Sequence, residues 1–523
     1  MGSTSPSGGK LDRSAGLVLI LFIFVLAICG LVYELIAGTL SSYLLGDSVT
    51  QFSLVIGLFL TAMGLGSYLS KFITRNLLAR LIGMEIAVGL VGGMMALIGF
   101  ATFSLSSYYV PVLLVMIGLI GTLVGLEVPL MVRILREISS LPITLANVLS
   151  ADYVGALVAS IVFPFLLLPQ FGVVRAGLLM GVVNVVVAGV VLWRLAPFCG
   201  RARRRLKIGC ALALTILILS FGLSGKLVAL LENKLYEDEV IYACDTQYQH
   251  LVLTRWREDI RLFLDGHLQF SSIDEYRYHE ALVHPAMISA RRRNTVLILG
   301  GGDGLAAREV AKYPQVERID IVDIDPVITN LFRNNVTLSK LNHGILSDSR
   351  VQIHNIDAMK FLKDTAGLYD VILIDLPDPS GVNIAKLYSR TFFSLVGRHL
   401  ADGGRLACQS TSPFRSREAF WCIVHTMEAA RWGAEGLRHR LAVHPYHTVV
   451  PTFGTWGFVV AGEDLLEAPQ APLTVPTRYL TQEILSGLFV FPPDMTEVKT
   501  PVSRLDDPVV SHLYRRGYHQ YLE

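Results

Sequence analysis

Charged residues are scarce in this chain of 523 residues. Only 17% of the residues are Asp, Glu, Lys or Arg, while 52% are hydrophobic. Soluble globular domains contain about 25% charged residues, so the composition excludes an ordinary soluble protein. The hydrophobic content equally excludes a disordered chain. A formal net charge of only +2 argues against nucleic acid as a partner, because nucleic-acid-binding proteins carry a strongly basic surface.

Cysteine and histidine patterns that bind metals are also missing. The six cysteines form no CxxC pair and no Cys/His array, which argues against a disulfide framework and a structural zinc site. The spacing of His439, His444 and His447 fits no common metal motif. We therefore predict that the chain binds no metal.

The scarcity of charge is confined to the first part of the chain. The first 230 residues contain 15 Lys and Arg and 7 Asp and Glu, whereas the remainder contains 30 and 36. All 13 histidines lie at His250 or later. This division predicts a membrane half joined to a soluble half.

Seven apolar runs are long enough to cross a bilayer, which takes roughly 17–25 residues. They lie at about 15–37, 51–70, 81–104, 107–132, 146–168, 173–193 and 208–225. We predict a flexible tail at 1–14, a transmembrane domain of about seven helices at 15–225 and a linker helix at 226–238. The small residues Gly89, Gly92 and Gly93 recur at a spacing that favours close packing between helices.

Four acids lie in or near these runs without an equal number of cations: Glu34, Glu85, Glu127 and Asp152. Intramembrane acids are energetically costly and often functional, so one hypothesis is a cation site or pathway. The alternative is an interfacial position or a hydrogen bond to a neighbouring Ser, Thr or Tyr. The places of Glu34 and Asp152 near segment ends favour this alternative.

The soluble half begins with short alternating stretches, which predict a small β subdomain at 239–290. Apolar strands then recur at 295–299, 319–322, 351–353, 371–374 and 405–408, with helical stretches between them. This alternation predicts a parallel, doubly wound α/β sheet over 291–523. The expected fold is thus a multi-pass α-helical membrane domain, a small β subdomain and a Rossmann-like domain of the methyltransferase type.

A glycine-rich turn follows the first strand of this sheet, at Gly300-Gly301-Gly302-Asp303-Gly304. Such a turn allows a nucleoside to approach the backbone closely. Asp323 ends the next strand about 20 residues later, where an acid binds ribose hydroxyls. The spacing predicts a nucleoside site, but it does not distinguish NAD from an adenosyl sulfonium ligand.

Further acids follow the next two strands. Asp357 is placed to accept a hydrogen bond from an adenine amino group. Asp375 and Asp378 follow the fourth strand, at the carboxyl edge where open α/β sheets bind ligands. Two carboxylates beside a nucleoside suit a cationic substrate, since one can hold an ammonium while the other takes its proton. For Asp378-Pro379, turn initiation is the structural alternative.

From about residue 248 to residue 463 the chain resembles the spermidine synthase family of polyamine aminopropyltransferases. The motifs that carry the resemblance are Tyr248-Gln249, Leu264-Asp265-Gly266, Asp274-Glu275, Tyr278-His279-Glu280, the glycine turn, Asp323-Ile324-Asp325, Asp357-Ala358, Asp375-x-x-Asp378-Pro379, Leu387-Tyr388-Ser389 and Pro451-Thr452-Phe453. The apolar runs are similar to those of the membrane-fused bacterial branch of the family.

The resemblance implies a co-substrate, decarboxylated S-adenosylmethionine, and no cofactor. The residues implied in binding this donor are Gln249, Gly300, Gly302, Asp303, Asp323, Asp357 and Ala358. Among them Asp323 would hold the ribose, Asp357 the adenine and Asp303, with Gln249 nearby, the aminopropyl ammonium.

The resemblance also implies a small diamine or polyamine as the acceptor. Tyr278 and His279 would line the junction between donor and amine, Asp375 would be the catalytic base, and Asp378 would help to hold the amine. Putrescine is the default acceptor, giving spermidine and methylthioadenosine. Departures on the amine side, among them Phe453 where the family commonly has a tyrosine, leave cadaverine, agmatine or spermidine as alternatives.

Two other functions remain open at this point. One is an S-adenosylmethionine-dependent methyltransferase, and the other is a polyamine transporter or sensor that uses the intramembrane acids. The expected partners are the amine, the lipid bilayer and, by analogy with soluble relatives, further copies of the chain in a homo-oligomer.

The expected location is the cell's inner membrane, with several crossings and a cytoplasmic catalytic domain. The basic residues at 10–13, 71–80, 133–136 and 194–207 disagree with this orientation. They all fall on one side if every run crosses, and the positive-inside rule makes that side cytoplasmic. A last crossing at 208–225 then places the soluble half outside. Either that run does not cross fully, or the charge rule fails, or the domain is external.

Overall fold

The computed structural model describes residues 13–522 except 46–47, 107, 137–139, 237, 434–438, 466–468 and 470. Nearly all of the tail predicted at 1–14 lies outside these residues. The chain divides into two compact units, Met1–His250 and Leu251–Glu523. The helical unit and the α/β unit, as we call them, are described separately.

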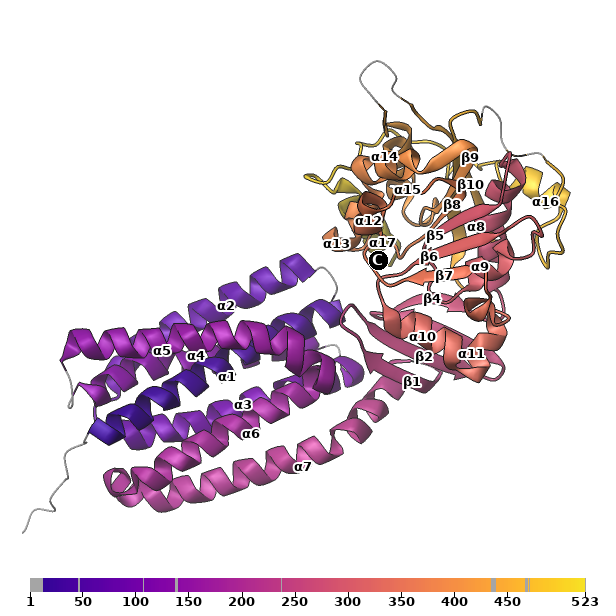
Figure 1. Cartoon of the computed structure of the whole chain (residues 1–523). Helices are drawn as coiled ribbons and strands as arrows, with labels where there is room; N and C mark the ends of the chain where they lie inside the picture. Colours follow the sequence, from indigo (N-terminus) through magenta and orange to yellow (C-terminus); the bar gives the residue numbers. More distant parts are fainter. Residues whose placement is uncertain are drawn as a thin grey trace, which may run out of the picture. The chain divides into compact units, whose positions relative to one another are not determined.

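Long apolar helices make up the helical unit (Figure 1). They are α1 (Arg13–Leu45), α2 (Ser48–Leu69), α3 (Leu77–Leu105), α4 (Tyr109–Leu135), α5 (Leu141–Val162), α6 (Leu168–Arg194) and α7 (Arg203–Leu235), with short helical turns η1 (Ser70–Phe72), η2 (Phe163–Leu167) and η3 (Ala196–Ala202). Each predicted apolar run overlaps one of α1 to α7. Among the described residues, six helical segments are long and apolar enough to cross a membrane, because α5, η2 and α6 run on as one segment of 54 residues.

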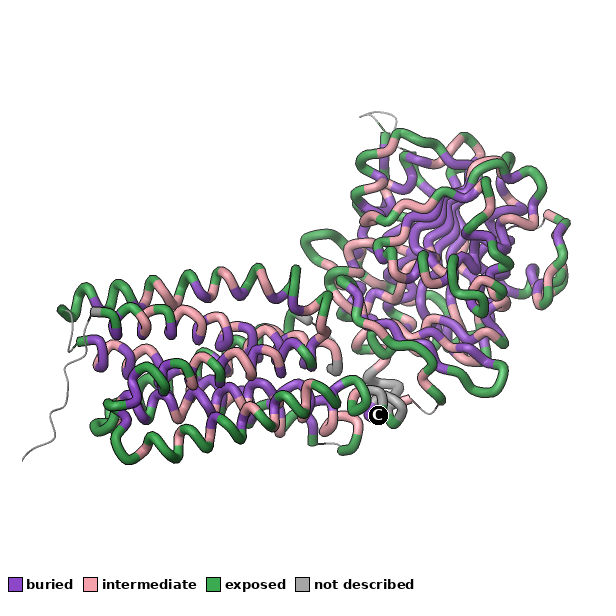
Figure 2. The backbone as a smooth tube through the Cα atoms, turned by 60° about the horizontal axis from the view of Figure 1, so that its bottom comes forward, coloured by how far each residue is buried: buried purple, intermediate pink, exposed green. Residues whose placement is uncertain are grey.

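Most of the residues predicted as a linker helix belong to α7, which continues to Leu235. The stretch after Lys226 is rich in Leu, Ala, Lys and Glu, which are good helix formers, so nothing in it favours an interruption. Many large apolar residues of these helices are exposed, among them Leu54, Leu60 and Leu157. Figure 2 shows exposed residues along the outer sides of the helices. Such faces suit a lipid environment.

Glycines bring α3 and α6 close together, as the sequence predicts. A Cβ atom on Gly93 would lie 3.0 Å from the Gly181 Cα, and one on Gly89 would lie 3.0 Å from the Gly181 carbonyl oxygen. A Cβ atom on Gly92 would lie 2.8 Å from the Tyr33 ring. The absent side chains therefore allow backbone-to-backbone contact in the middle of the bundle.

A small sheet of four strands has the order β1-β2-β3-β4. Its strands are β1 (Glu239–Asp245), β2 (His250–Trp256), β3 (Asp259–Leu264) and β4 (His267–Ser271). Asp265 and Gly266 join β3 to β4 with φ angles of 49° and 78°, the backbone that an Asp-Gly hairpin turn requires. The sequence indicates the first three strands, and β4 is the antiparallel partner that this turn creates.

Seven strands form the sheet of the α/β unit, in the order β10-β11-β9-β8-β5-β6-β7. The parallel strands are β5 (Thr295–Gly300), β6 (Arg318–Val322), β7 (Val351–His354), β8 (Tyr369–Asp375) and β9 (Leu400–Gln409). The antiparallel pair is β10 (Ala442–Val450) and β11 (Gly454–Gly462). The five predicted strands are parallel, as expected, and β10 and β11, which are not among the predicted strands, add an antiparallel edge, so the whole sheet is mixed. A three-residue connection can join only antiparallel neighbours, since a parallel pair needs a long crossover.

Helices cover both faces of this sheet (Figure 1). They are α8 (Glu275–Ser289), α9 (Leu305–Val310), α10 (Pro326–Asn334), α11 (Val336–Leu341), η4 (Ile345–Ser347), α12 (Ala358–Asp364), α13 (Val382–Ala385), η5 (Lys386–Tyr388), α14 (Arg390–Arg398), α15 (Arg417–Glu428), α16 (Gln482–Gly487) and α17 (Val509–Leu522). Strands β5 and β8 lie at the buried centre (Figure 2). Strand order reverses beside β5, and open α/β sheets bind ligands at the carboxyl ends of the strands at such a point.

Candidate active site

The glycine turn after β5 has a backbone that only glycine adopts easily. Gly300, Gly301 and Gly304 have φ angles of 87°, 62° and 79°. A Cβ atom on Gly300 would lie 1.9 Å from the Asp375 carbonyl oxygen, and Gly301 N donates to that oxygen at 3.2 Å. The turn is therefore packed directly against the end of β8, which joins the predicted nucleoside loop to the predicted catalytic acid.

Asp323 supports this turn from the end of β6. Its carboxylate accepts hydrogen bonds from Gly302 N at 3.0 Å and from Asp325 N at 2.8 Å. Burial raises the pKa of Asp323 to about 6. The structure thus places Asp323 beside Gly302, and the role of Asp323 toward the ribose stays a prediction.

Asp303 lies within the turn and close to Asp375. Its Oδ1 accepts a hydrogen bond from Leu305 N at 2.8 Å, and Asn342 holds its carbonyl oxygen at 2.8 Å. Burial raises the pKa of Asp303 to about 6, with a further rise from Asp375 and an opposing effect from His279. A cation between Asp303 and Asp375 would relieve their repulsion.

The remaining predicted donor residues, Asp357, Ala358 and Gln249, lie outside the glycine turn. Asp357 caps α12 by accepting from Lys360 N at 3.0 Å and pairs with Lys386 at 2.7 Å, while Ala358 is the first buried residue of that helix. Gln249 lies between β1 and β2 in the helical unit. The roles of Asp357 and Ala358 toward adenine, and of Gln249 toward the ammonium, stay predictions.

Asp375 is held between two side chains of α8. Tyr278 donates its phenol O–H to Asp375 Oδ1 at 2.7 Å, and His279 Nε2 lies 4.0 Å from Oδ2. Burial raises the pKa of Asp375, although His279 and Tyr278 oppose the rise. A carboxylate with a raised pKa is a better proton acceptor near neutral pH.

His279 is a cation in this site. Its Nδ1 lies 2.7 Å from Glu275 Oε2. Burial opposes the charge, but Glu275, Asp375 and Asp303 outweigh it and raise the pKa of His279 to about 9. The imidazolium therefore partly balances the negative charge around the base.

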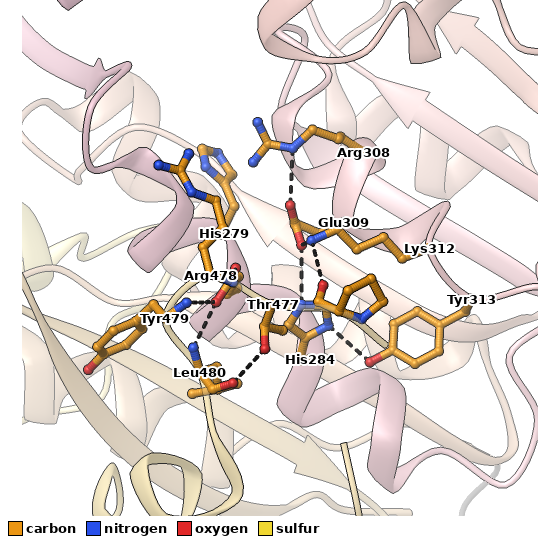
Figure 3. A network of polar contacts seen from close by, with 12 residues as sticks. His279, His284, Arg308, Glu309, Lys312, Tyr313, Thr477, Arg478, Tyr479 and Leu480 are labelled. Atoms are coloured by element: carbon orange, nitrogen blue, oxygen red, sulfur yellow. Dashed lines mark hydrogen bonds and ion pairs between the residues drawn. The ribbon is translucent and has the colours of Figure 1, made fainter. Parts of the chain in front are cut away.

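A buried network holds α8 and His279 in place. Arg308 binds both carboxylate oxygens of Glu275, at 2.8 Å and 3.0 Å, and its Nε contacts Glu309 at 3.0 Å. Figure 3 shows Glu309 between Arg308, Lys312 and His284.

The three residues of the motif Tyr278-His279-Glu280 do not all face Asp375. Glu280 instead accepts hydrogen bonds from three backbone N–H groups, those of residues 478–480.

Asp378 has surroundings that the sequence did not reveal. Burial raises its pKa to about 7, while Tyr514, Gln409 and Thr411 oppose the rise by hydrogen bonding. Its Oδ1 is buried without a hydrogen-bond partner among the residues that the structure describes. A ligand N–H group could therefore bind this oxygen.

Tyr514 comes from α17, in a region where the sequence shows no chemical motif. The tyrosine is buried, its ring lies 4.6 Å from that of Tyr518, and α17 packs on α15. Phe453, which stands where the family commonly has a tyrosine, packs against the Tyr278 ring at 6.3 Å. The packing of α17 on α15 thus places the Tyr514 phenol beside Asp378, and no local sequence pattern predicts this contact.

In the described ranges, no group of three or more His, Cys, Asp or Glu residues could hold a metal ion. The prediction that the chain binds no metal stays a prediction. The prominent property of the site is its acidity, since it contains four aspartates (Asp303, Asp323, Asp375 and Asp378), two of which, Asp303 and Asp375, act on His279. Such a site suits a substrate with several positive charges.

Comparison with known proteins agrees with this chemistry. A model of the spermine/spermidine synthase domain matches residues 275–468. The chain is 42% identical to a polyamine aminopropyltransferase of Leptospira interrogans, over 96% of this chain and 98% of the relative. The chain belongs to the polyamine aminopropyltransferase family. As a member of this family it is an aminopropyltransferase.

Other relatives extend the comparison. Polyamine aminopropyltransferase 2 of Ralstonia nicotianae is 43% identical over 97% of this chain and 99% of the relative. These alignments span nearly the whole chain, so they include the apolar half. A crystal structure of spermidine synthase with the transition-state analogue AdoDATO covers 48% of this chain and 85% of its own, with 24% identity and a TM-score of 0.44.

Proposed function

We propose that the chain transfers the aminopropyl group of decarboxylated S-adenosylmethionine to an amine, with putrescine as the default acceptor. The products are then spermidine and methylthioadenosine. The observation that carries the proposal is the position of Asp375, which is buried beside the glycine turn and held by Tyr278 at 2.7 Å. Asp375 therefore lies between the glycine turn, which we assign to the donor, and Tyr278, which we assign to the junction with the amine.

Asp375 serves as the base. An alkylammonium, with a pKa near that of lysine at about 10.4, is not a nucleophile until it loses a proton. Asp375 accepts that proton, and its raised pKa suits the task. Tyr278 fixes the direction of the carboxylate, and the His279 imidazolium keeps it ionised in the free site.

The transfer itself needs positioning more than further chemistry. The amine nitrogen forms a bond to the propyl carbon, the carbon–sulfur bond breaks, and the sulfonium takes the electron pair and becomes a neutral thioether. The donor therefore supplies its own leaving group. The protein contributes mainly by holding the two reactants in line, which can account for several powers of ten in rate.

The site contains a candidate binding residue for the donor's ribose, for the donor's ammonium and for the distal ammonium of the diamine. We assign the ribose to Asp323, the donor ammonium to Asp303 and the distal ammonium of the diamine to Asp378 with Tyr514. The unpartnered Oδ1 of Asp378 supports the last assignment. Whether the acceptor is putrescine or a longer amine depends on the space next to Asp378.

Membrane anchoring is the second part of the proposal. The six apolar helical segments support an inner-membrane protein with several crossings. We place the α/β unit in the cytoplasm, where its substrates would be made, and expect homo-oligomers, as soluble relatives of the family commonly form.

Product analysis tests the proposal. Purified full-length chain is incubated with putrescine, cadaverine, agmatine or spermidine, and with either the decarboxylated or the intact donor. We expect methylthioadenosine and a lengthened amine, from the decarboxylated donor only. Formation of S-adenosylhomocysteine from the intact donor would overturn the proposal and establish a methyltransferase instead.

A further inference from the structure

The interior of the helical unit contains polar side chains that lack partners. Glu85 of α3 is 0% exposed and Glu127 of α4 is 3% exposed. Within the described part of the chain, neither carboxylate oxygen of Glu85 has a hydrogen-bond partner. A buried carboxyl without a partner is costly, so its presence calls for an explanation.

Two further groups at the same place are also unsatisfied. The phenol oxygen of Tyr33 on α1 and the Oδ1 of Asn184 on α6 have no hydrogen-bond partner among the described residues, and both residues are 0% exposed. Asn184 donates through Nδ2 to the Glu85 carbonyl oxygen at 3.0 Å, which fixes the amide beside Glu85. Polar groups from α1, α3 and α6 are therefore buried with unused hydrogen-bonding atoms.

Glu127 belongs to the same part of the bundle, because α3, which carries Glu85, packs against α4, which carries Glu127. The Glu85 and Glu127 carboxyls lie close enough to interact directly, and the Asn184 amide lies next to the Glu85 carboxyl. Tyr33 is within electrostatic range of both acids. Of the other two acids predicted for this site, Asp152 acts on Glu127 from a half-buried position, whereas no such coupling joins Glu34 to the cluster.

The cluster is part of the packed bundle, not a surface feature. Gly92 lies against the Tyr33 ring, and Gly89 lies against Asn184, where a Cβ atom would be 3.2 Å from the Asn184 Cβ. The glycines of α3 thus make room for Tyr33 and Asn184 beside the helix that carries Glu85. The described residues form no ion pair with either Glu85 or Glu127.

We propose that Glu85 and Glu127, with Tyr33 and Asn184, form a second binding site for a protonated primary amine inside the helical unit. The unused atoms are the carboxylate oxygens of Glu85, the amide oxygen of Asn184 and the phenol oxygen of Tyr33, all of which can accept a hydrogen bond. An alkylammonium brings three N–H donors and a positive charge. A divalent metal ion would instead demand six or more oxygen ligands in a regular arrangement. The choice of an amine rests on the proposed function, since the proposed substrates and products carry such groups.

Equilibrium binding tests the proposal. Full-length chain in lipid nanodiscs is titrated with radiolabelled spermidine, for wild type, the double variant Glu85→Gln with Glu127→Gln, and the acceptor-site variant Asp378→Asn. We expect two sites in wild type. The double variant should lose one site, with at least tenfold weaker binding, and should still form methylthioadenosine at the wild-type rate, which shows that it is folded.

Controls separate the inference from the enzymatic proposal. Glu34→Gln, an acid of the same unit outside the cluster, should bind both equivalents, and Glu127→Gln alone should weaken the same site. Equal binding by wild type and the double variant would overturn the inference and leave the enzymatic proposal intact. Sodium or magnesium ions that displace spermidine from this site at their own micromolar concentrations would also overturn it, because the site would then be a metal-ion site.

Discussion

Glu309 in the α/β unit and Glu85 in the helical unit are both buried glutamates, but their carboxyl groups have opposite surroundings. Glu309 contacts Arg308, Lys312 and His284, and its pKa falls to about 2 because these partners outweigh the effect of burial. Glu85 has no partner for either carboxylate oxygen within the described ranges. Charged partners let Glu309 stabilise the scaffold, whereas the lack of partners at Glu85 is the basis of the proposed amine site.

Asp378 extends this comparison into the α/β unit. It is the acid of the active site with an unpartnered buried oxygen, while Asp375 and Asp323 are held by Tyr278 and by backbone N–H groups. A cationic substrate would complete the environment of Asp378, as an amine would complete that of Glu85. The acids with unpartnered oxygens in the two units, Asp378 and Glu85, are thus both proposed to bind an amine.

Replacement of Asp375 tests its proposed role as the catalytic base. Asp375→Asn keeps the shape and can still bond to Tyr278, but it cannot take a proton. We expect kcat to fall by about a thousandfold. Methylthioadenosine binding, measured by calorimetry, should persist. Asp402→Asn, at an exposed acid, serves as the control, and simultaneous loss of turnover and of nucleoside binding would instead indicate a structural role.

Paired and unpaired glutamates should differ in their effect on stability. Glu309→Gln leaves Lys312 and His284 without their anion, and we expect it to lower the free energy of unfolding by about 3 kcal/mol. Glu85→Gln removes no partner, so stability should be unchanged or increased. Thermal unfolding of the full chain, followed by tryptophan fluorescence, measures both. A similar loss for the two variants would break the comparison.

The acceptor side can be tested through α17. Tyr514→Phe removes the phenol next to Asp378 without changing the packing volume. We expect the KM for the amine to rise about tenfold, the cost of one hydrogen bond to a charged group. The KM for the donor should stay constant, because the proposed donor residues Asp303 and Asp323 lie in the turns that follow β5 and β6, not on α17. An equal rise in both KM values would show that α17 acts only on the fold.

A pH profile gives the smallest effect. The pKa of Asp378 is raised to about 7, so the carboxylate that holds the ammonium is present above pH 7 and is lost as the pH falls through 7. The KM for the amine should therefore rise between pH 7.5 and pH 6, by less than about tenfold. In Tyr514→Phe the midpoint should move to higher pH, because the phenol normally keeps this pKa down. A midpoint unmoved by the substitution would separate Tyr514 from Asp378.

Much of the donor side was predictable because its signals are local. The glycine turn, Asp323 and the end of β8 follow directly on buried strands, and parallel strands bring their carboxyl ends to one edge. Tyr278 and His279 were predictable only by resemblance to a family, since nothing in the spacing of α8 shows that it faces Asp375. Likewise, nothing in the spacing of α8 shows that Glu280, two residues after Tyr278, binds the backbone of residues 478–480 instead of facing Asp375.

The division into an apolar and a charged half, the glycine turn and the strand-end acids all follow from the amino-acid sequence alone. These properties depend on composition and on neighbours along the chain. The tertiary structure decided the antiparallel β10–β11 edge, the approach of Tyr514 to Asp378 and the meeting of Glu85 with Glu127, Tyr33 and Asn184. Such contacts depend on the register and rotation of packed helices, which arise from side-chain packing between segments far apart in the sequence and leave no local pattern.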